Sequence, residues 1–92
     1  MENMNYNYYV IGGQYARFCY GGSNTLKGAK QLATKCREHW DNWQGWNTPR
    51  IYAAEDCVIA DTEFFNEQVI PKAGTFPIVE YDNQKRRWVN CR

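Results

Sequence analysis

The stretch Leu26–Trp40, LKGAKQLATKCREHW, carries the clearest secondary-structure signal in this 92-residue chain. Its apolar residues recur at helical spacing along one stripe, and the opposite side is polar. The tripeptide Ser-Asn-Thr at 23–25 can cap a helix N-terminus. Gly28 costs the helix about 1 kcal/mol relative to Ala, which indicates close packing on a sheet or a later helix start. We expect a helix over residues 26–40 whose apolar stripe consists of Leu26, Ala29, Leu32, Ala33, Cys36 and Trp40.

Segments on both sides of this helix predict β-strands. Tyr8–Tyr20 indicates a hairpin, because aromatic and β-branched residues flank Gly12-Gly13, a pair that accepts the positive φ of a tight turn. On its return strand, the expected core face consists of Ala16, Phe18 and Tyr20. Residues 55–67 predict a short strand or loop with an acidic bias, and residues 71–74 predict a turn. The other predicted strands are Arg50–Ala54 and a terminal hairpin of Pro77–Tyr81 and Arg86–Asn90.

The order ββα-β-ββ predicts an α+β fold, with one α-helix packed on a four- to five-stranded antiparallel sheet. The length fits a single domain over residues 1–92, with residues 1–6 as a candidate disordered start. No signal peptide and no membrane-spanning run is visible. We expect a cytoplasmic protein with reduced cysteines at Cys19, Cys36, Cys57 and Cys91.

Charge composition limits the classes of partner. The chain has 11 basic and 10 acidic residues and a formal net charge of +1, which does not indicate a strongly basic nucleic-acid binder or an acidic mimic. Basic residues nevertheless cover the outer face of the predicted helix, and Lys85-Arg86-Arg87 stands beside Trp88. Single-strand binders use such mixtures of basic and aromatic residues. The alternative function is therefore a nucleic-acid-binding accessory protein that uses the helix face with Lys27, Lys30 and Arg37.

Three of the four tryptophans lie within the run WDNWQGW at residues 40–46. Trp40 extends the apolar stripe and is predicted to be a core residue. A glycine and a proline take Trp46 out of regular structure, so we expect it to be an interface anchor on a loop, with a core position as the open alternative. Trp, Tyr and Arg dominate binding hot spots, and the residues predicted to share this surface are Arg50 and Tyr52 or Tyr81.

No complete catalytic or metal-binding pattern is visible in the sequence. Cys36-x-x-His39 is half of a zinc pattern, and Cys36 lies on the apolar stripe, where a free cysteine packs as a small hydrophobe. His39 is the only histidine, and no nucleophile motif accompanies it. The acidic pairs after residue 54 lack the glycine spacing of a calcium loop. We expect no metal and no cofactor, and a small enzyme using His39 is the third hypothesis.

The segments YYVIGGQYARFCYGG and DNWQGWNTPRIYAAEDC resemble small uncharacterised proteins of bacteriophages and mobile elements of gut bacteria. The resemblance covers most of the chain and brings no established activity or site. It implies a context, because small phage accessory proteins often bind a host protein, and inhibitors of CRISPR and other defences are among them. The first functional hypothesis is therefore a small non-enzymatic binding protein, a phage-borne inhibitor of a host defence protein, with a protein as its partner.

Overall fold

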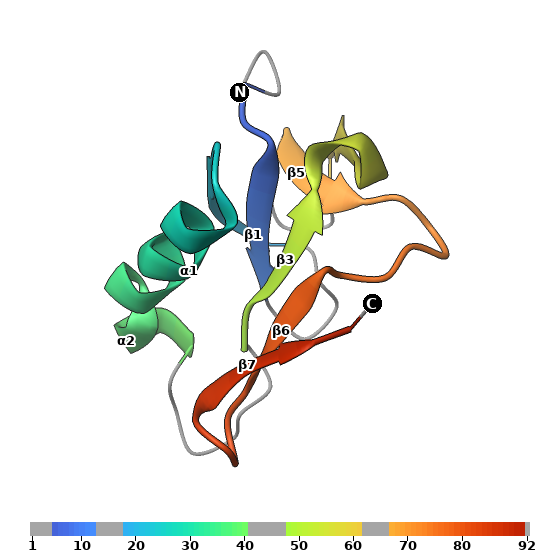
Figure 1. Ribbon diagram of the computed structural model, residues 1–92. Coiled ribbons are helices and arrows are strands. Elements are labelled where there is room, and N and C mark those ends of the chain that lie inside the picture. Colours follow the sequence, from blue (N-terminus) through green and yellow to red (C-terminus); the bar gives the residue numbers. More distant parts are fainter. Residues whose placement is uncertain (1–4, 13–17, 41–47, 62–66, 92) are drawn as a thin grey trace.

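The computed structural model describes residues 5–12, 18–40, 48–61 and 67–91. Five strands form one antiparallel sheet in the order β2-β1-β3-β6-β7, and β4 pairs with β5 in a separate two-stranded sheet (Figure 1). The α+β class is as predicted, whereas the second sheet was not expected. The elements are β1 (Tyr8–Gly12), β2 (Phe18–Ser23), α1 (Leu26–Lys35), α2 (Arg37–Trp40), β3 (Arg50–Ala53), the 3-10 helix η1 (Ala54–Asp56), β4 (Cys57–Ala60), β5 (Gln68–Pro71), β6 (Val79–Asp82) and β7 (Arg87–Asn90).

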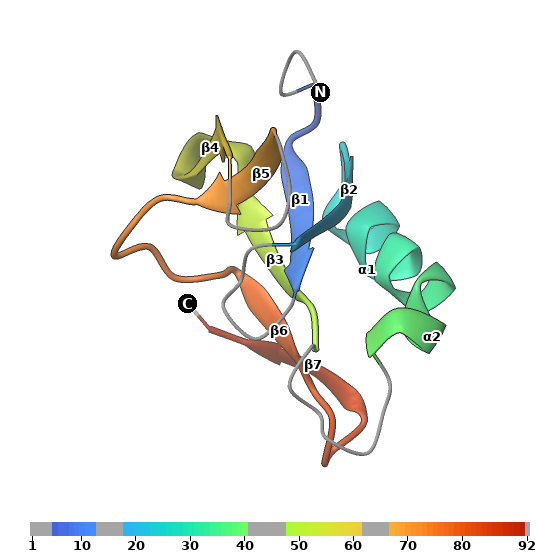
Figure 2. The same ribbon diagram turned by 180° about the vertical axis from the view of Figure 1, so that it is seen from behind.

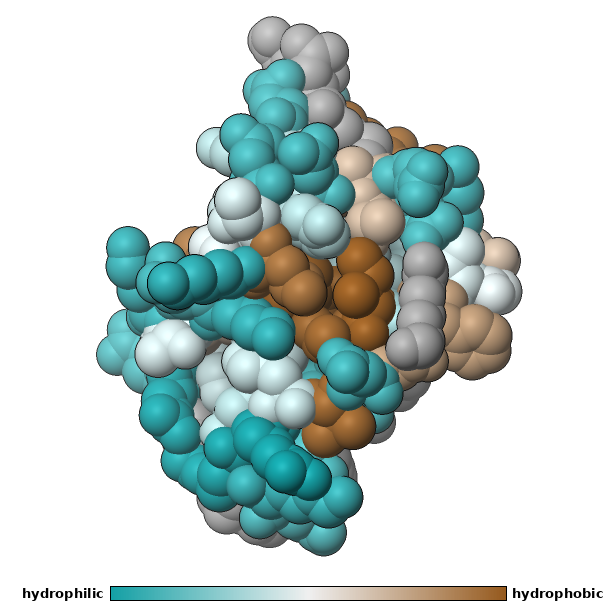
Figure 3. All heavy atoms as spheres, in the orientation of Figure 1, coloured by the Kyte–Doolittle hydropathy of each residue, from teal (hydrophilic) through white to brown (hydrophobic). Residues whose placement is uncertain are grey.

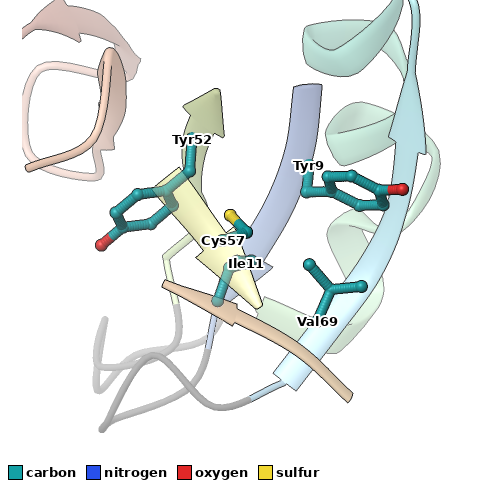
Figure 4. Close-up of a cluster of buried hydrophobic side chains, with 5 residues drawn as sticks. All are labelled: Tyr9, Ile11, Tyr52, Cys57 and Val69. Carbon is teal, nitrogen blue, oxygen red and sulfur yellow. The ribbon is translucent and has the colours of Figure 1, made fainter. Parts of the chain in front are cut away.

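The part of the five-stranded sheet that β2, β1 and β3 form is covered on both faces. In Figures 1 and 2, α1 and α2 lie on one side of β1 and β3, and the β4–β5 sheet lies on the other side. On the helix side the buried cluster is Val10, Ala29, Ala33, Ile51 and Val79. On the other side it is Tyr9, Ile11, Tyr52, Cys57 and Val69 (Figure 4). Successive residues of a strand point to opposite faces, so β1 contributes alternately to the two clusters.

Burial on both faces corrects the prediction for β2. Tyr20 packs against the helix-side cluster, but Cys19, expected to face away from the core, packs against the other one. Phe18, expected in the core, is 37% exposed and contacts the Tyr20 ring edge-on at 5.0 Å. A sheet with a layer on each side has no single core face, so neighbouring residues of β2 pack into the cores on both sides of the sheet.

The predicted helix over residues 26–40 is divided in two at Cys36. This residue has φ −95° and ψ 13°, and its N–H donates to the carbonyl oxygens of Leu32 and Ala33, both at 3.1 Å. The short helix α2 then continues to Trp40 in a new direction. The break turns the end of the helical segment toward the sheet.

Trp40 is a core residue, as predicted, with 2% of its surface exposed. Its indole Nε1–H donates to the carbonyl oxygen of Ala33 at 2.9 Å, and its ring lies 4.8 Å from that of Tyr81 on β6. A buried indole needs a partner for its N–H group, and the carbonyl at the end of α1 supplies one. The residue therefore joins the helix layer to the sheet.

Gly28 is required by the helix cap rather than by packing on the sheet. Its N–H donates to Thr25 Oγ1 at 2.9 Å, and the N–H of Thr25 donates to Ser23 Oγ at 3.4 Å. A Cβ at position 28 would overlap Ser23 Oγ and lie 2.9 Å from Thr25 Oγ1. Glycine is therefore the residue that lets both hydroxyl side chains fold over the start of the helix.

The remaining expectations divide between described and undescribed residues. β3 forms where it was predicted, to within one residue, and the β6–β7 hairpin forms with its turn one residue later than predicted. All four cysteines are free thiols. Tyr6, in the candidate disordered start, places its ring edge-on to Tyr9 at 6.0 Å. The Gly12-Gly13 turn and Trp46 depend on residues outside the described ranges. None of the helices that the structure describes is long and apolar enough to cross a membrane.

Replacing Trp40 separates its packing from its hydrogen bond. We expect Trp40→Ala to lower the free energy of unfolding by about 3–5 kcal/mol, the cost of truncating a buried large aromatic. Trp40→Phe keeps most of the ring packing and loses the bond to Ala33, so its loss should be about 1–2 kcal/mol. Urea denaturation of the three proteins measures both values. Equal losses in the two variants would show that the hydrogen bond, not the packing, carries the effect.

Gly28→Ala should destabilise the protein although alanine is the better helix former. The added methyl group collides with the capping hydroxyls, and such overpacking costs about 1–3 kcal/mol. The loss should be smaller in a Ser23→Ala background, where the nearest obstructing oxygen is gone. Thermal unfolding of the single and double variants gives the coupling, and a stabilised G28A single variant would contradict this account of the cap.

Candidate functional site

The predicted binding residues do not form one surface. Lys27 and Arg37 are exposed and Lys30 is half-buried, and all three lie on the helix side of the sheet. Arg50 and Tyr52 are two residues apart on β3, so their side chains point to the same face of the sheet. Tyr52 belongs to the cluster on the β4–β5 side, and Arg50 therefore faces that side too. Of the predicted binding residues that the structure describes, only Lys27, Lys30 and Arg37 lie on the helix side of the sheet.

Two of the predicted residues have structural partners on the β4–β5 side. Tyr52 is 5% exposed inside the cluster around Cys57, so it is a core residue and leaves the candidate surface. Arg50 Nε lies 3.5 Å from Glu80 Oε2 on the neighbouring strand. Trp46 lies outside the described residues, and its role as an anchor stays a prediction.

An aromatic row that the sequence did not predict crosses the helix side. It consists of Trp40 on α2, Tyr81 on β6 and Trp88 on β7. Tyr81 and Trp88 are cross-strand partners with ring centroids 5.5 Å apart, and both are half-buried. The guanidinium carbon of Arg37 lies 6.0 Å from the centre of the Trp40 ring. The predicted strands 77–81 and 86–90 would have paired residue 81 with residue 86. The observed turn at residues 83–86 pairs Asp82 with Arg87 and therefore Tyr81 with Trp88.

Basic residues lie on α1 and α2 and in the β6–β7 turn. The β6–β7 turn is held by Asp82, whose Oδ1 accepts from the N–H groups of Gln84 and Lys85 at 2.9 and 3.0 Å. Figure 3 shows hydrophilic residues on the left and at the bottom, where α1, α2 and this turn lie, and hydrophobic residues near the centre of the view; the residues between the helices and the turn are of intermediate hydropathy. We call this surface the basic side; its basic residues are Lys27, Lys30, Lys35 and Arg37 on the helices, with Lys85 and Arg86 in the turn, and it also carries the exposed Glu38 on α2. Arg87 has the opposite parity to Trp88 and faces the other side of the sheet.

Half of the ten acidic residues belong to one segment whose described part lies on the opposite side of the sheet. Residues 51–71 contain five acidic and no basic residues. The described part of this segment forms the end of β3, the 3-10 helix η1 and the β4–β5 sheet, which cover the face of the large sheet away from α1 (Figures 1 and 2). We call this surface the acidic side; its described carboxylates are Glu55, Asp56, Asp61 and Glu67. It also carries Lys72, whose Nζ donates to the carbonyl oxygen of Glu55 at 2.9 Å, and Arg50 faces the same side.

The cysteines are poorly suited to nucleophilic chemistry. Burial, followed by the nearby Cys19 and Asp56, raises the pKa of the Cys57 thiol to about 12. The Cys57 thiol also donates to the carbonyl oxygen of Ala53 at 3.5 Å. Burial likewise raises the pKa of Cys19 and of Cys91. The thiolate is the reactive form, so these three groups are held in their unreactive state near neutral pH.

The described residues give no support for a metal site or for catalysis by the histidine. Within the described ranges, no three His, Cys, Asp or Glu side chains come together as a metal site. Cys36 is half-buried at the helix break. The side chain of His39 lies outside what the structure describes, so an enzyme that uses it stays a prediction.

No protein-family model, curated protein or solved structure matches this chain. The resemblance to proteins of phages and mobile elements therefore stays a prediction.

The raised pKa of Cys57 predicts a loss of stability at alkaline pH. The thiol ionises near pH 9.0 when unperturbed and near pH 12 in the folded protein, so the folded state holds more protons between these values. The free energy of unfolding should then fall as the pH rises through this window. In Cys57→Ala this contribution is absent, so the stability advantage of the wild type over C57A should shrink with pH. Urea midpoints of both proteins from about pH 8 to about pH 11 measure it, and a constant difference would contradict the assignment.

Proposed function

We propose that this protein is a non-enzymatic binding protein whose basic side docks on an acidic surface of a protein partner. The observation that supports this most is the uneven distribution of charge: four basic residues lie on α1 and α2, and four carboxylates lie around the β4–β5 sheet on the other side. The half-buried rings of Tyr81 and Trp88 lie on the helix side. An apolar centre enclosed by a polar rim is the usual anatomy of a protein interface.

The aromatic row favours a protein over a single-stranded nucleic acid. A base needs an open ring face on which to stack. Trp40 is buried, and Tyr81 lies between Trp40 at 4.8 Å and Trp88 at 5.5 Å, so neighbouring rings occupy its surroundings. Rigid, half-buried Tyr and Trp side chains beside arginine are instead typical of hot spots in protein interfaces. The nucleic-acid hypothesis is kept as an outcome of the test below.

The protonated thiols support a role in binding rather than catalysis. Cys19, Cys57 and Cys91 all have raised pKa values, which makes them weak nucleophiles. A host protein, such as a defence factor, is the class of partner that follows from the resemblance to phage proteins.

The test compares partner capture by three forms of the protein in bacterial lysate. The variant Lys35→Glu with Lys85→Glu reverses two exposed charges on the basic side. The control, Glu55→Gln with Val58→Lys, alters exposed residues of the acidic side. We expect the first variant to lose at least about tenfold in partner affinity, because mutated rim charges slow association and weaken complementarity. The control should retain the partner, and nuclease treatment should leave its yield unchanged.

Two outcomes would overturn this function. If nuclease removes the captured material, and the purified protein binds single-stranded homopolymers with an affinity that falls steeply with salt, the nucleic-acid hypothesis replaces it. Equal capture by all three forms would show that the basic side is not the contact surface. Circular dichroism of each variant confirms that the comparison is made between folded proteins.

A further inference from the structure

The outer face of the β4–β5 sheet is a second surface built like an interface. Cys57, Ile59 and Val69 turn inward to the core cluster. Alternation along the strands therefore turns Val58 and its cross-strand partner Ile70 outward. Val58 is 38% exposed, and Ile70 is half-buried.

Carboxylates flank this apolar centre at both ends of the sheet. Glu55 and Asp56 in η1 stand before β4, at the end where Cys57 pairs with Pro71, and Lys72 follows β5 there and donates its Nζ to the carbonyl oxygen of Glu55. The four described carboxylates still outnumber this one cation. Asp61 follows β4 and Glu67 precedes β5, at the other end, and Asp61 Oδ1 accepts from the N–H of Glu67 at 3.0 Å. An apolar pair with an acidic rim thus matches, with opposite charge, the aromatic centre and basic rim of the basic side.

One molecule cannot satisfy this complementarity, because its two surfaces lie on opposite faces of the five-stranded sheet. We propose that a second copy of this chain is the partner of the acidic side, with the basic side of one copy seated on the β4–β5 sheet of the next. This inference rests on the proposed function, since it uses the basic side as the docking surface. An interface of standard size takes about 800 Å² from each partner, which the accessible surface of 6001 Å² can supply on both sides.

The contact is head-to-tail, so it differs from a twofold dimer. Each copy has one basic and one acidic side, and association therefore continues into rings or chains of copies. Self-association covers the basic side, and an outside partner with an acidic surface would displace the neighbouring copy from it. The purified protein would then dissociate on binding its partner.

The test is sedimentation of the purified protein at low and high salt. We expect the average mass to rise with concentration at low salt and to fall to that of the monomer at about 1 M salt, where the Debye length is about 3 Å. The variants K35E/K85E and E55Q/V58K each lack one of the two surfaces, so each alone should associate at least about tenfold more weakly. A mixture of the two should recover association, because K35E/K85E keeps its acidic side and E55Q/V58K keeps its basic side.

The mixing result separates a head-to-tail contact from a symmetric one. A wild type that stays monomeric at every salt concentration, or a mixture that associates no better than its components, overturns the inference. Val58→Thr keeps the β-branched shape and serves as a milder variant, with a smaller loss of self-association expected. Failure of the proposed function would appear elsewhere, as unchanged partner capture by K35E/K85E.

Discussion

The burial of Trp40 is the contact on which the arrangement of the molecule depends most. In a continuous helix, the Ala33 carbonyl would accept from the N–H of residue 37. At the break, this carbonyl accepts from the N–H of Cys36 and also from the indole of Trp40, which is buried with its N–H group satisfied. The same ring contacts Tyr81, so one side chain ends the helix and attaches it to β6. The break and the burial are two parts of one interaction.

The parts of the fold that local signals govern could be predicted from the sequence. The apolar stripe of α1 and the polar turn between β6 and β7 act within a few residues, and both form, the turn one residue later than expected. The β4–β5 sheet could not be predicted in the same way, because each strand has four residues and its burial comes from the sheet beneath it. The sequence pattern that indicates a second layer lies in β1, where Tyr9, Val10 and Ile11 are all apolar. A strand with apolar residues on both parities is buried on both faces.

Residue type alone does not predict which face of the sheet a candidate binding residue points to. Arg50 and Tyr52 are of the kinds found in hot spots, yet strand parity turns both away from the helix side. The same parity brings Tyr81 and Trp88 together, because the hairpin turn fixes their register. Side-chain direction follows from register, so the surface could be assembled only once the strand pairing was known.

The net charge of +1 conceals the strongest electrostatic feature of the molecule. Five of the ten acidic residues fall within residues 51–71, which hold no basic residue, and the described part of this segment forms the layer on the far side of the sheet. Chain order therefore sorts part of the charge. Binding partners respond to the local potential of a surface rather than to the sum over the protein. A near-zero net charge also leaves little repulsion between copies at long range. Contacts between opposite sides are then decided by complementarity within a Debye length, where the two surfaces of this protein match.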